Sequence, residues 1–116
     1  MAAVQLTPTI VRVEFTTAEK VLGLLRDVTA RRDQVTDATV HTDPLAVIRG
    51  YRAPGFAVPA RRKVGTWRRP GQRVAVAVTA GIPAIRLRLR GHRYDELVIS
   101  HPDAAALSAA LQPTLP

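Results

Sequence analysis

Apolar and polar residues alternate along several short segments of the chain, which is the period of a β-strand with one buried face. In the clearest segment, residues 84–90, three aliphatic residues alternate with three arginines: Ile85, Leu87 and Leu89 against Arg86, Arg88 and Arg90. Similar patterns predict further strands at 11–15, 28–30, 35–42, 63–68, 74–78 and 94–100. About six or seven antiparallel strands are therefore expected.

Helical spacing and capping signals predict three short helices. Thr16 and Glu19 have the spacing of a capping box, and apolar residues follow at helical intervals up to Val28. Asp43, Pro44 and Gly50 supply the start and stop signals of a two-turn helix. A last helix is expected over 103–111, where it is too short to be stable unless it packs on the sheet.

Residues 51–62, which include Pro54 and Gly55, are expected to form a loop with a turn at those two residues. Other glycines are spaced about one per turn or helix end, so they are interpreted as structural. The predicted core consists of Val11, Val13, Phe15, Leu22, Leu25, Val76, Ile85, Leu87, Leu89, Val98, Leu107 and Leu111.

A length of 116 residues with 47% apolar residues is typical of one globular domain. Residues 10–112 are assigned to this domain, 1–9 to a flexible N-terminus and 113–116 to a frayed tail. The chain has no cysteine, which excludes disulfides and thiolate chemistry. It also lacks the pattern of a signal peptide or a membrane-spanning helix, so a soluble, cytoplasmic protein is expected.

Charge is unevenly distributed along the chain. The net charge is +8, yet residues 44–94 contain no Asp or Glu and carry twelve of the seventeen basic residues. This acid-free stretch favours contact with anions such as nucleic acid or an acidic lipid surface. The alternative is a compositional bias toward arginine on a solvated surface. The candidate anion- or partner-binding residues are Arg61, Arg62, Lys63, Arg68, Arg69, Arg86, Arg88 and Arg90.

Residues that could perform catalysis are few. The three histidines lack the spacing of metal ligands, so they are interpreted as surface or capping residues. Ser100, His101 and Asp103 lie too close in sequence to converge as a triad, and Asp95 and Glu96 are expected to be solvated. The sequence therefore predicts a protein that is not an enzyme and that uses no metal or cofactor.

Four segments resemble small actinobacterial proteins with a pleckstrin-homology-like (PH-like) domain: Thr16–Val28, Arg49–Gly55, Gly65–Arg68 and Tyr94–Leu111. The resemblance implies an α+β fold: a strongly bent antiparallel sheet in two near-orthogonal layers, with short helices and a C-terminal capping helix. Trp67 lies on a central strand rather than in the last helix, so phosphoinositide recognition is not carried over. The family has no assigned function, and the resemblance implies no chemistry.

A binding module is the functional expectation that remains. Open sheet edges favour contact with a protein partner or with a second copy of the chain. The alternative is an electrostatic binder of anionic lipid or nucleic acid that uses basic residues between Arg49 and Arg93.

Overall fold

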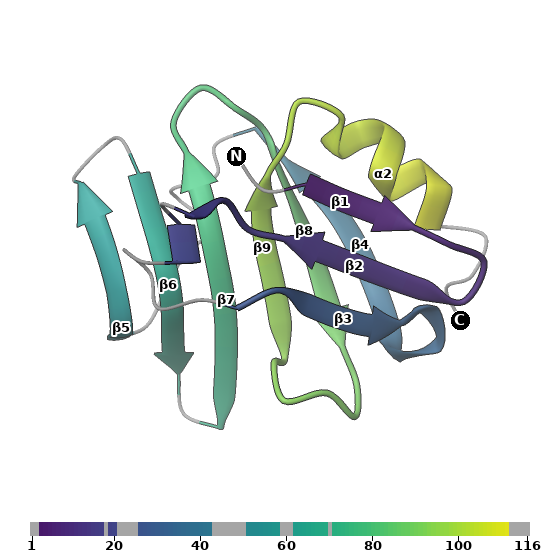
Figure 1. Cartoon of the computed structure of the whole chain (residues 1–116), viewed down its shortest axis with the longest axis horizontal. Helices are drawn as coiled ribbons and strands as arrows, with labels where there is room; N and C mark the ends of the chain where they lie inside the picture. Colours follow the sequence, from purple (N-terminus) through teal and green to yellow (C-terminus); the bar gives the residue numbers. More distant parts are fainter. Residues whose placement is uncertain are drawn as a thin grey trace.

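The computed structural model describes residues 3–17, 19–20, 26–42, 51–58, 62–69 and 71–111, with 51–58, 62–63 and 68–69 described as backbone only. Its larger sheet has six strands, in the spatial order β4-β8-β9-β7-β6-β5. Their bounds are β4 (Val35–His41), β5 (Tyr51–Val58), β6 (Arg62–Arg69), β7 (Gln72–Thr79), β8 (Ala84–Leu89) and β9 (Glu96–Ser100). Figure 1 shows β5 at one edge of this sheet and β4 at the other.

A smaller sheet has the order β1 (Ala3–Leu6), β2 (Ile10–Glu14) and β3 (Val28–Arg31). Its strands run across those of the larger sheet in Figure 1, and helix α2 (Ala104–Leu111) packs on β4 and β8. The described part is thus α+β with two sheets and a helix near its C-terminal end. This confirms the predicted fold class at that level.

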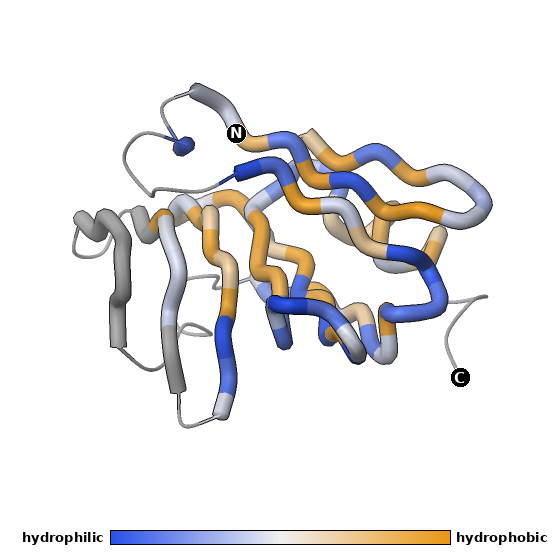
Figure 2. The backbone as a smooth tube through the Cα atoms, turned by 60° about the horizontal axis from the view of Figure 1, so that its bottom comes forward, coloured by the Kyte–Doolittle hydropathy of each residue, from blue (hydrophilic) through white to orange (hydrophobic). Residues whose placement is uncertain are grey.

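The main core lies between the larger sheet on one side and the smaller sheet and α2 on the other. It includes Val11, Val13, Phe15, Ile85, Leu87, Leu97 and Leu111, with Leu107 only partly buried. A second buried cluster, on the opposite face of the larger sheet, comprises Trp67, Val74, Val76, Val78, Ala84 and Val98. Because β7 and β9 are buried on both faces, they are hydrophobic over most of their length, as Figure 2 shows. Of the predicted core, Leu22 and Leu25 lie outside the described residues.

One strand pairing differs from the antiparallel arrangement that the sequence predicts. Strand β9 lies between β7 and β8, antiparallel to β8 and parallel to β7. The physical reason is the short connection at 80–83, which makes β7 and β8 run in opposite directions. A strand that turns back from β8 and inserts between the two must then run parallel to β7.

Another correction concerns residues 51–58, predicted as a loop. They form β5, which pairs with β6 and whose register shifts between Arg52 and Gly55. Pro54 lies within this irregularity, and a residue without an N–H is tolerated there because β5 is an edge strand. The pairing of β5 with β6 outweighs the turn signal of Pro54 and Gly55, and the turn residues in the sequence do not reveal this pairing. Nine strands are described instead of six or seven, with β1 inside the segment assigned to a flexible N-terminus.

The structure confirms the predicted capping box and the predicted last helix. Thr16 and Glu19 form both bonds of the predicted capping box: Thr16 N donates to Glu19 Oε1 at 2.9 Å, and Glu19 N donates to Thr16 Oγ1 at 3.2 Å. The predicted last helix is present as α2, beginning at Ala104. The expected helix at 43–50 and the tail at 113–116 lie outside the described residues.

Arg32, in the short 3₁₀ helix η1 (Arg32–Gln34), connects three parts of the fold. Its guanidinium donates to Thr7 O at 2.9 Å in the β1–β2 connection and to Ala110 O at 2.7 Å near the end of α2. A cation at a helix C-terminus satisfies carbonyl groups that have no partner within the helix. This arginine therefore helps to hold α2 against the smaller sheet.

Candidate functional site

Five of the eight predicted binding residues cannot be placed as side chains. Arg62, Lys63, Arg68 and Arg69 lie at the two ends of β6, where the structure describes only the backbone, and Arg61 lies outside the described residues. The other three are on β8 or directly after it. As predicted, Arg86 and Arg88 alternate with the buried Ile85, Leu87 and Leu89.

Arg86 is held by a carboxylate. Its Nε donates to Glu96 Oε2 at 3.1 Å and its second terminal nitrogen donates to Glu96 Oε1 at 2.6 Å. The Glu96 side chain is 7% exposed and that of Arg86 is 19% exposed. The expectation that Glu96 is solvated is wrong, because β9 pairs with β8 and brings this residue onto the arginine face of β8. The pairing removes Arg86 from the arginines that are free to contact a partner.

Arg88 is only loosely held. Its Nε lies 3.7 Å from Glu96 Oε1 and its side chain is 54% exposed. Together with Arg86, Gln72 and the two carboxylates Asp95 and Glu96, it lines an open polar pocket of about 270 Å³. Two arginines facing two carboxylates leave this pocket without a strong positive field. Residues 44–94 contain no acidic residue, but in the folded protein carboxylates from outside this stretch lie against β8.

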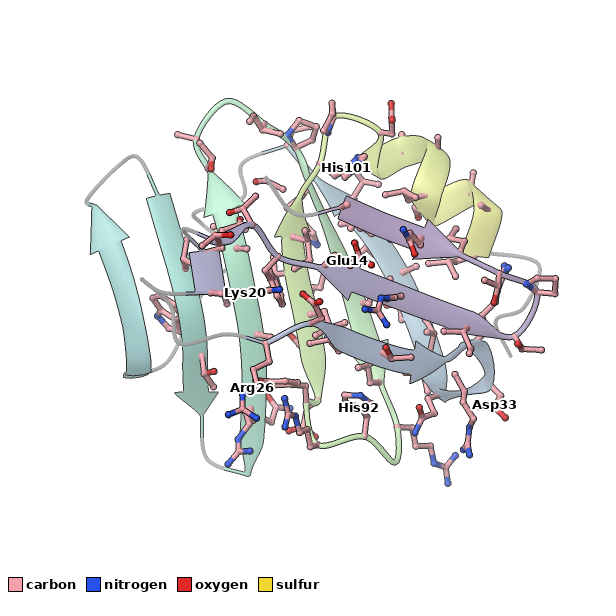
Figure 3. All side chains as sticks on the ribbon, viewed as in Figure 1. Glu14, Lys20, Arg26, Asp33, His92 and His101 are labelled. Carbon is pink, nitrogen blue, oxygen red and sulfur yellow. The ribbon has the colours of Figure 1, made fainter. Side chains whose placement is uncertain are left out.

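Positive charge remains unneutralised at another place, which we call the arginine rim: Arg26, Arg73, Arg90 and Arg93. Hydrogen bonds bring the segments that carry these residues together at one end of the molecule, including the contact of His92 Nε2 with Thr29 O, which joins the β8–β9 connection to β3, the strand that starts two residues after Arg26. The β8–β9 connection bonds to η1 through Arg90 N and Gln34 O at 2.8 Å, and to β7 through Asp95 N and Arg73 O at 2.8 Å. Arg26 and His92 lie along the same end of the molecule in Figure 3.

None of the four guanidinium groups of the arginine rim has an ion-pair or hydrogen-bond partner among the residues that the structure describes. Arg93 instead lies over the Tyr94 ring, with its Cζ atom 5.1 Å from the ring centroid. Arg90 is the one rim residue among the predicted binding residues. Sequence reasoning missed Arg26, because this residue lies far outside the acid-free stretch and beside Asp27.

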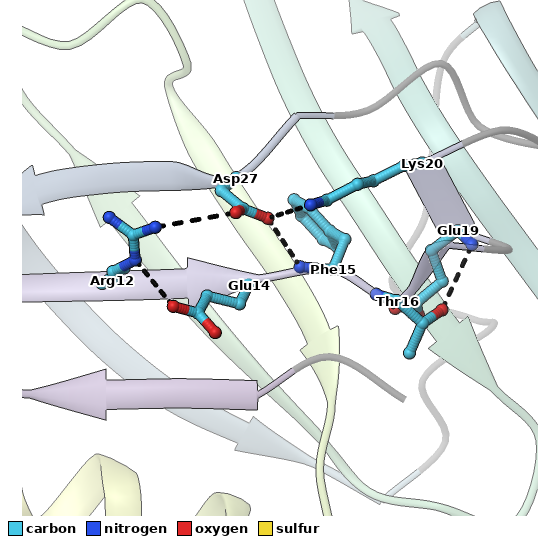
Figure 4. Close-up of polar contacts among 7 residues, drawn as sticks. All are labelled: Arg12, Glu14, Phe15, Thr16, Glu19, Lys20 and Asp27. Atoms are coloured by element: carbon cyan, nitrogen blue, oxygen red, sulfur yellow. Dashed lines mark hydrogen bonds and ion pairs between the residues drawn. The ribbon is translucent and has the colours of Figure 1, made fainter.

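Asp27 is occupied by its neighbours, as Figure 4 shows. Its Oδ1 accepts a hydrogen bond from Phe15 N at 3.1 Å and lies 3.2 Å from Lys20 Nζ, and its Oδ2 lies 3.7 Å from Arg12. Desolvation raises the pKa of Asp27, but the contacts with Lys20, Phe15 N and Arg12 outweigh it, so the pKa is below its usual value. This carboxylate stays ionised and is shared by two cations other than the rim arginines.

The histidines make structural contacts. His92 Nδ1 accepts from Tyr94 N at 3.1 Å, so its Nε2 carries the proton that meets Thr29 O at 3.1 Å. His101 Nδ1 accepts from Asp103 N at 3.0 Å, while Ser100 Oγ donates to Ile82 O at 3.1 Å. Ser100, His101 and Asp103 thus organise a turn. No group of three or more His, Asp or Glu suited to a metal ion is present in the described part of the chain.

Comparison of the chain with protein-family models, with curated proteins and with solved structures found no significant match. Across the described ranges, no helix has both the length and the apolar character needed to cross a bilayer.

Proposed function

We propose that the protein is a non-enzymatic interaction module that adds a second copy of itself, strand to strand, at β5. The observation that carries this proposal is the position of β5: it is eight residues long, it is an edge of the six-stranded sheet, and β6 is its one partner among the described strands. The backbone N–H and C=O groups on the outer side of such a strand form a template for another strand.

Pro54 and the irregular register beside it limit how much of β5 is available for pairing. The regular part is Gly55–Val58, where each residue has a defined partner on β6. Antiparallel pairing of this part with its copy around a twofold axis gives a closed dimer, the commonest symmetry among soluble oligomers. The basic Arg52 on the same strand disfavours a longer, open assembly through repulsion between like charges.

The test is the mass of the protein in sedimentation equilibrium, combined with two neighbouring proline variants, Ala57→Pro and Val58→Pro. Adjacent residues of a strand direct their N–H groups to opposite sides. One variant therefore loses a bond to β6 and lowers Tm, whereas the other loses only dimer formation. A monomer at all concentrations, or two variants with the same effect on Tm and mass, contradicts the proposal.

We infer that the protein has no catalytic role and uses no cofactor, since Ser100, His92 and His101 are engaged in backbone contacts.

The PH-like identity is supported by the second sheet lying across the first and by α2 packing on β4 and β8, while the parallel β7–β9 pair departs from it. The cytoplasm, a reducing compartment, suits a chain without cysteine.

The second candidate, an electrostatic binder of nucleic acid or anionic lipid, is favoured by the unpaired charges of the arginine rim. Salt separates the two candidates. Strand pairing through backbone bonds should change little with ionic strength, whereas binding through phosphate contacts falls by orders of magnitude between about 50 and 200 mM salt. Sedimentation at both salt concentrations, with and without a random oligonucleotide and anionic vesicles, decides between them.

A further inference from the structure

A pocket at the arginine rim has the composition of an oxyanion site. Its volume is about 340 Å³, and it is lined by Arg26, Asp27, Val28, Thr29, His92 and Arg93. It lies where the start of β3 meets the β8–β9 connection, two segments more than sixty residues apart, joined by the contact between His92 Nε2 and Thr29 O. We call it the Arg26–Arg93 pocket.

Both arginines of this pocket are exposed and carry a positive charge. Neither Arg26 nor Arg93 has an ion-pair partner among the described residues. The carboxylate of Asp27 also lines the pocket, but Lys20, Arg12 and Phe15 N hold it. The pocket therefore retains an excess of positive charge.

Two of the residues that line the pocket, His92 and Arg93, are already held in place. His92 has both ring nitrogens occupied, by Tyr94 N and Thr29 O, and its ring stacks on that of Tyr94 with the centroids 6.1 Å apart. Arg93 lies over the same Tyr94 ring, so cation–π attraction restricts its side chain. A guanidinium held in this way loses less entropy when it binds.

We propose that the Arg26–Arg93 pocket binds a single phosphate group of a soluble molecule. Guanidinium groups bind phosphate oxygens in pairs of charge-assisted hydrogen bonds, and two guanidiniums match the two charges of a phosphate dianion. A nucleic acid strand is disfavoured, because the two aromatic rings described at this pocket are not open to stack a base: Tyr94 is buried and His92 is stacked on it. A membrane is disfavoured too, because the exposed large apolar residues in the described part, Ile10 and Val40, lie on other elements.

The experiment is a titration of the isotopically labelled protein with inorganic phosphate at low salt, followed by NMR of the amides of His92, Arg93 and Tyr94. Saturable shifts at these amides are expected. Arg26→Gln and Arg93→Gln should each weaken binding about tenfold, the loss of one charge-assisted contact. Arg90→Gln is the matched control: it removes an unpaired charge from the same rim but not from the pocket, and should change the affinity less than about twofold.

Absence of shifts up to high phosphate concentration, or the same loss in all three variants, shows a diffuse field instead of a site and overturns the proposal. The same holds if anionic vesicles or a random oligonucleotide shift amides across the whole rim while inorganic phosphate shifts none. Because the three arginines are exposed and have no ionic partner among the described residues, their variants should keep the Tm of the parent protein, which checks the fold. The dimer proposed at β5 does not depend on any of these results.

Discussion

The arginines of β8 and those of the arginine rim differ in their counter-charges, although composition alone does not distinguish them. Arg86 is bound by the buried Glu96 in a two-point contact. Arg26 and Arg93 face a pocket and have no ionic partner among the described residues. What differs is the neighbouring strand: β9 places Glu96 against Arg86, whereas none of the carboxylates that the structure describes pairs with a rim arginine. A basic segment becomes a binding surface only where the fold leaves it without counter-charges.

The largest expected effect comes from breaking the buried pair. Glu96→Gln leaves the guanidinium of Arg86 partly buried without its counter-charge, and should lower the free energy of unfolding by about 3 kcal/mol. This value is at the lower end for buried pairs, because the Arg86 side chain keeps 19% exposure. Urea denaturation measures it. A loss below about 1 kcal/mol means that solvent screens the pair as it does on a surface.

Replacing both partners gives a smaller effect. The double variant Arg86→Met/Glu96→Leu removes both charges from the face that also carries Val98 and Val76, and should lie within about 1 kcal/mol of the parent protein. Thermal and urea unfolding of the double variant beside Glu96→Gln measures the contrast. If the double variant is as unstable as Glu96→Gln, the pair itself stabilises the sheet and the cost is not that of an unpaired charge.

Asp27 carries the prediction of pH dependence. Because its pKa is lower in the folded protein, the ionised carboxylate stabilises the fold above the pKa of the unfolded chain, about 3.9, and this contribution is lost as the pH falls through the folded value. Asp27→Asn should therefore be less stable than the parent at pH 7, with the difference shrinking below about pH 4. Stability curves at several pH values measure this.

Asp33→Asn is the matched control for Asp27. The carboxylate of Asp33 is highly exposed and pairs with Arg31 at 3.0 Å, so its removal should cost less than about 0.5 kcal/mol. Equal effects of the two substitutions would show that Asp27 is also only a surface charge.

The smallest effects are expected at the rim. Arg26→Gln, which removes an exposed charge that has no ionic partner among the described residues, should change the free energy of unfolding by no more than about 0.5 kcal/mol. Differential scanning measures it, with Glu96→Gln as the sensitive reference. A clear gain in stability would show that the rim arginines repel one another and that their closeness costs folding energy. A clear loss would mean that Arg26 has a structural role.

Local patterns along the chain are sufficient for much of the secondary structure. The alternation at 84–90 predicts β8 with its buried and exposed faces, and the spacing of Thr16 and Glu19 predicts a capping box that both hydrogen bonds confirm. The period of side chains along a strand and the reach of a capping side chain depend on residues close in sequence. Predictions of that kind need no knowledge of the fold.

Neighbours across the sheet are decided by the tertiary structure instead. Insertion of β9 beside β8 places Glu96 against Arg86, and the β8–β9 connection places Arg93 at the same pocket as Arg26. The edge position of β5 accommodates Pro54 within a strand that reads as a loop. Charge and pairing act through space, so residues ten or sixty positions apart determine whether an arginine is neutralised or left open. The spacing of residues along the sequence does not determine these distances between them in the folded protein.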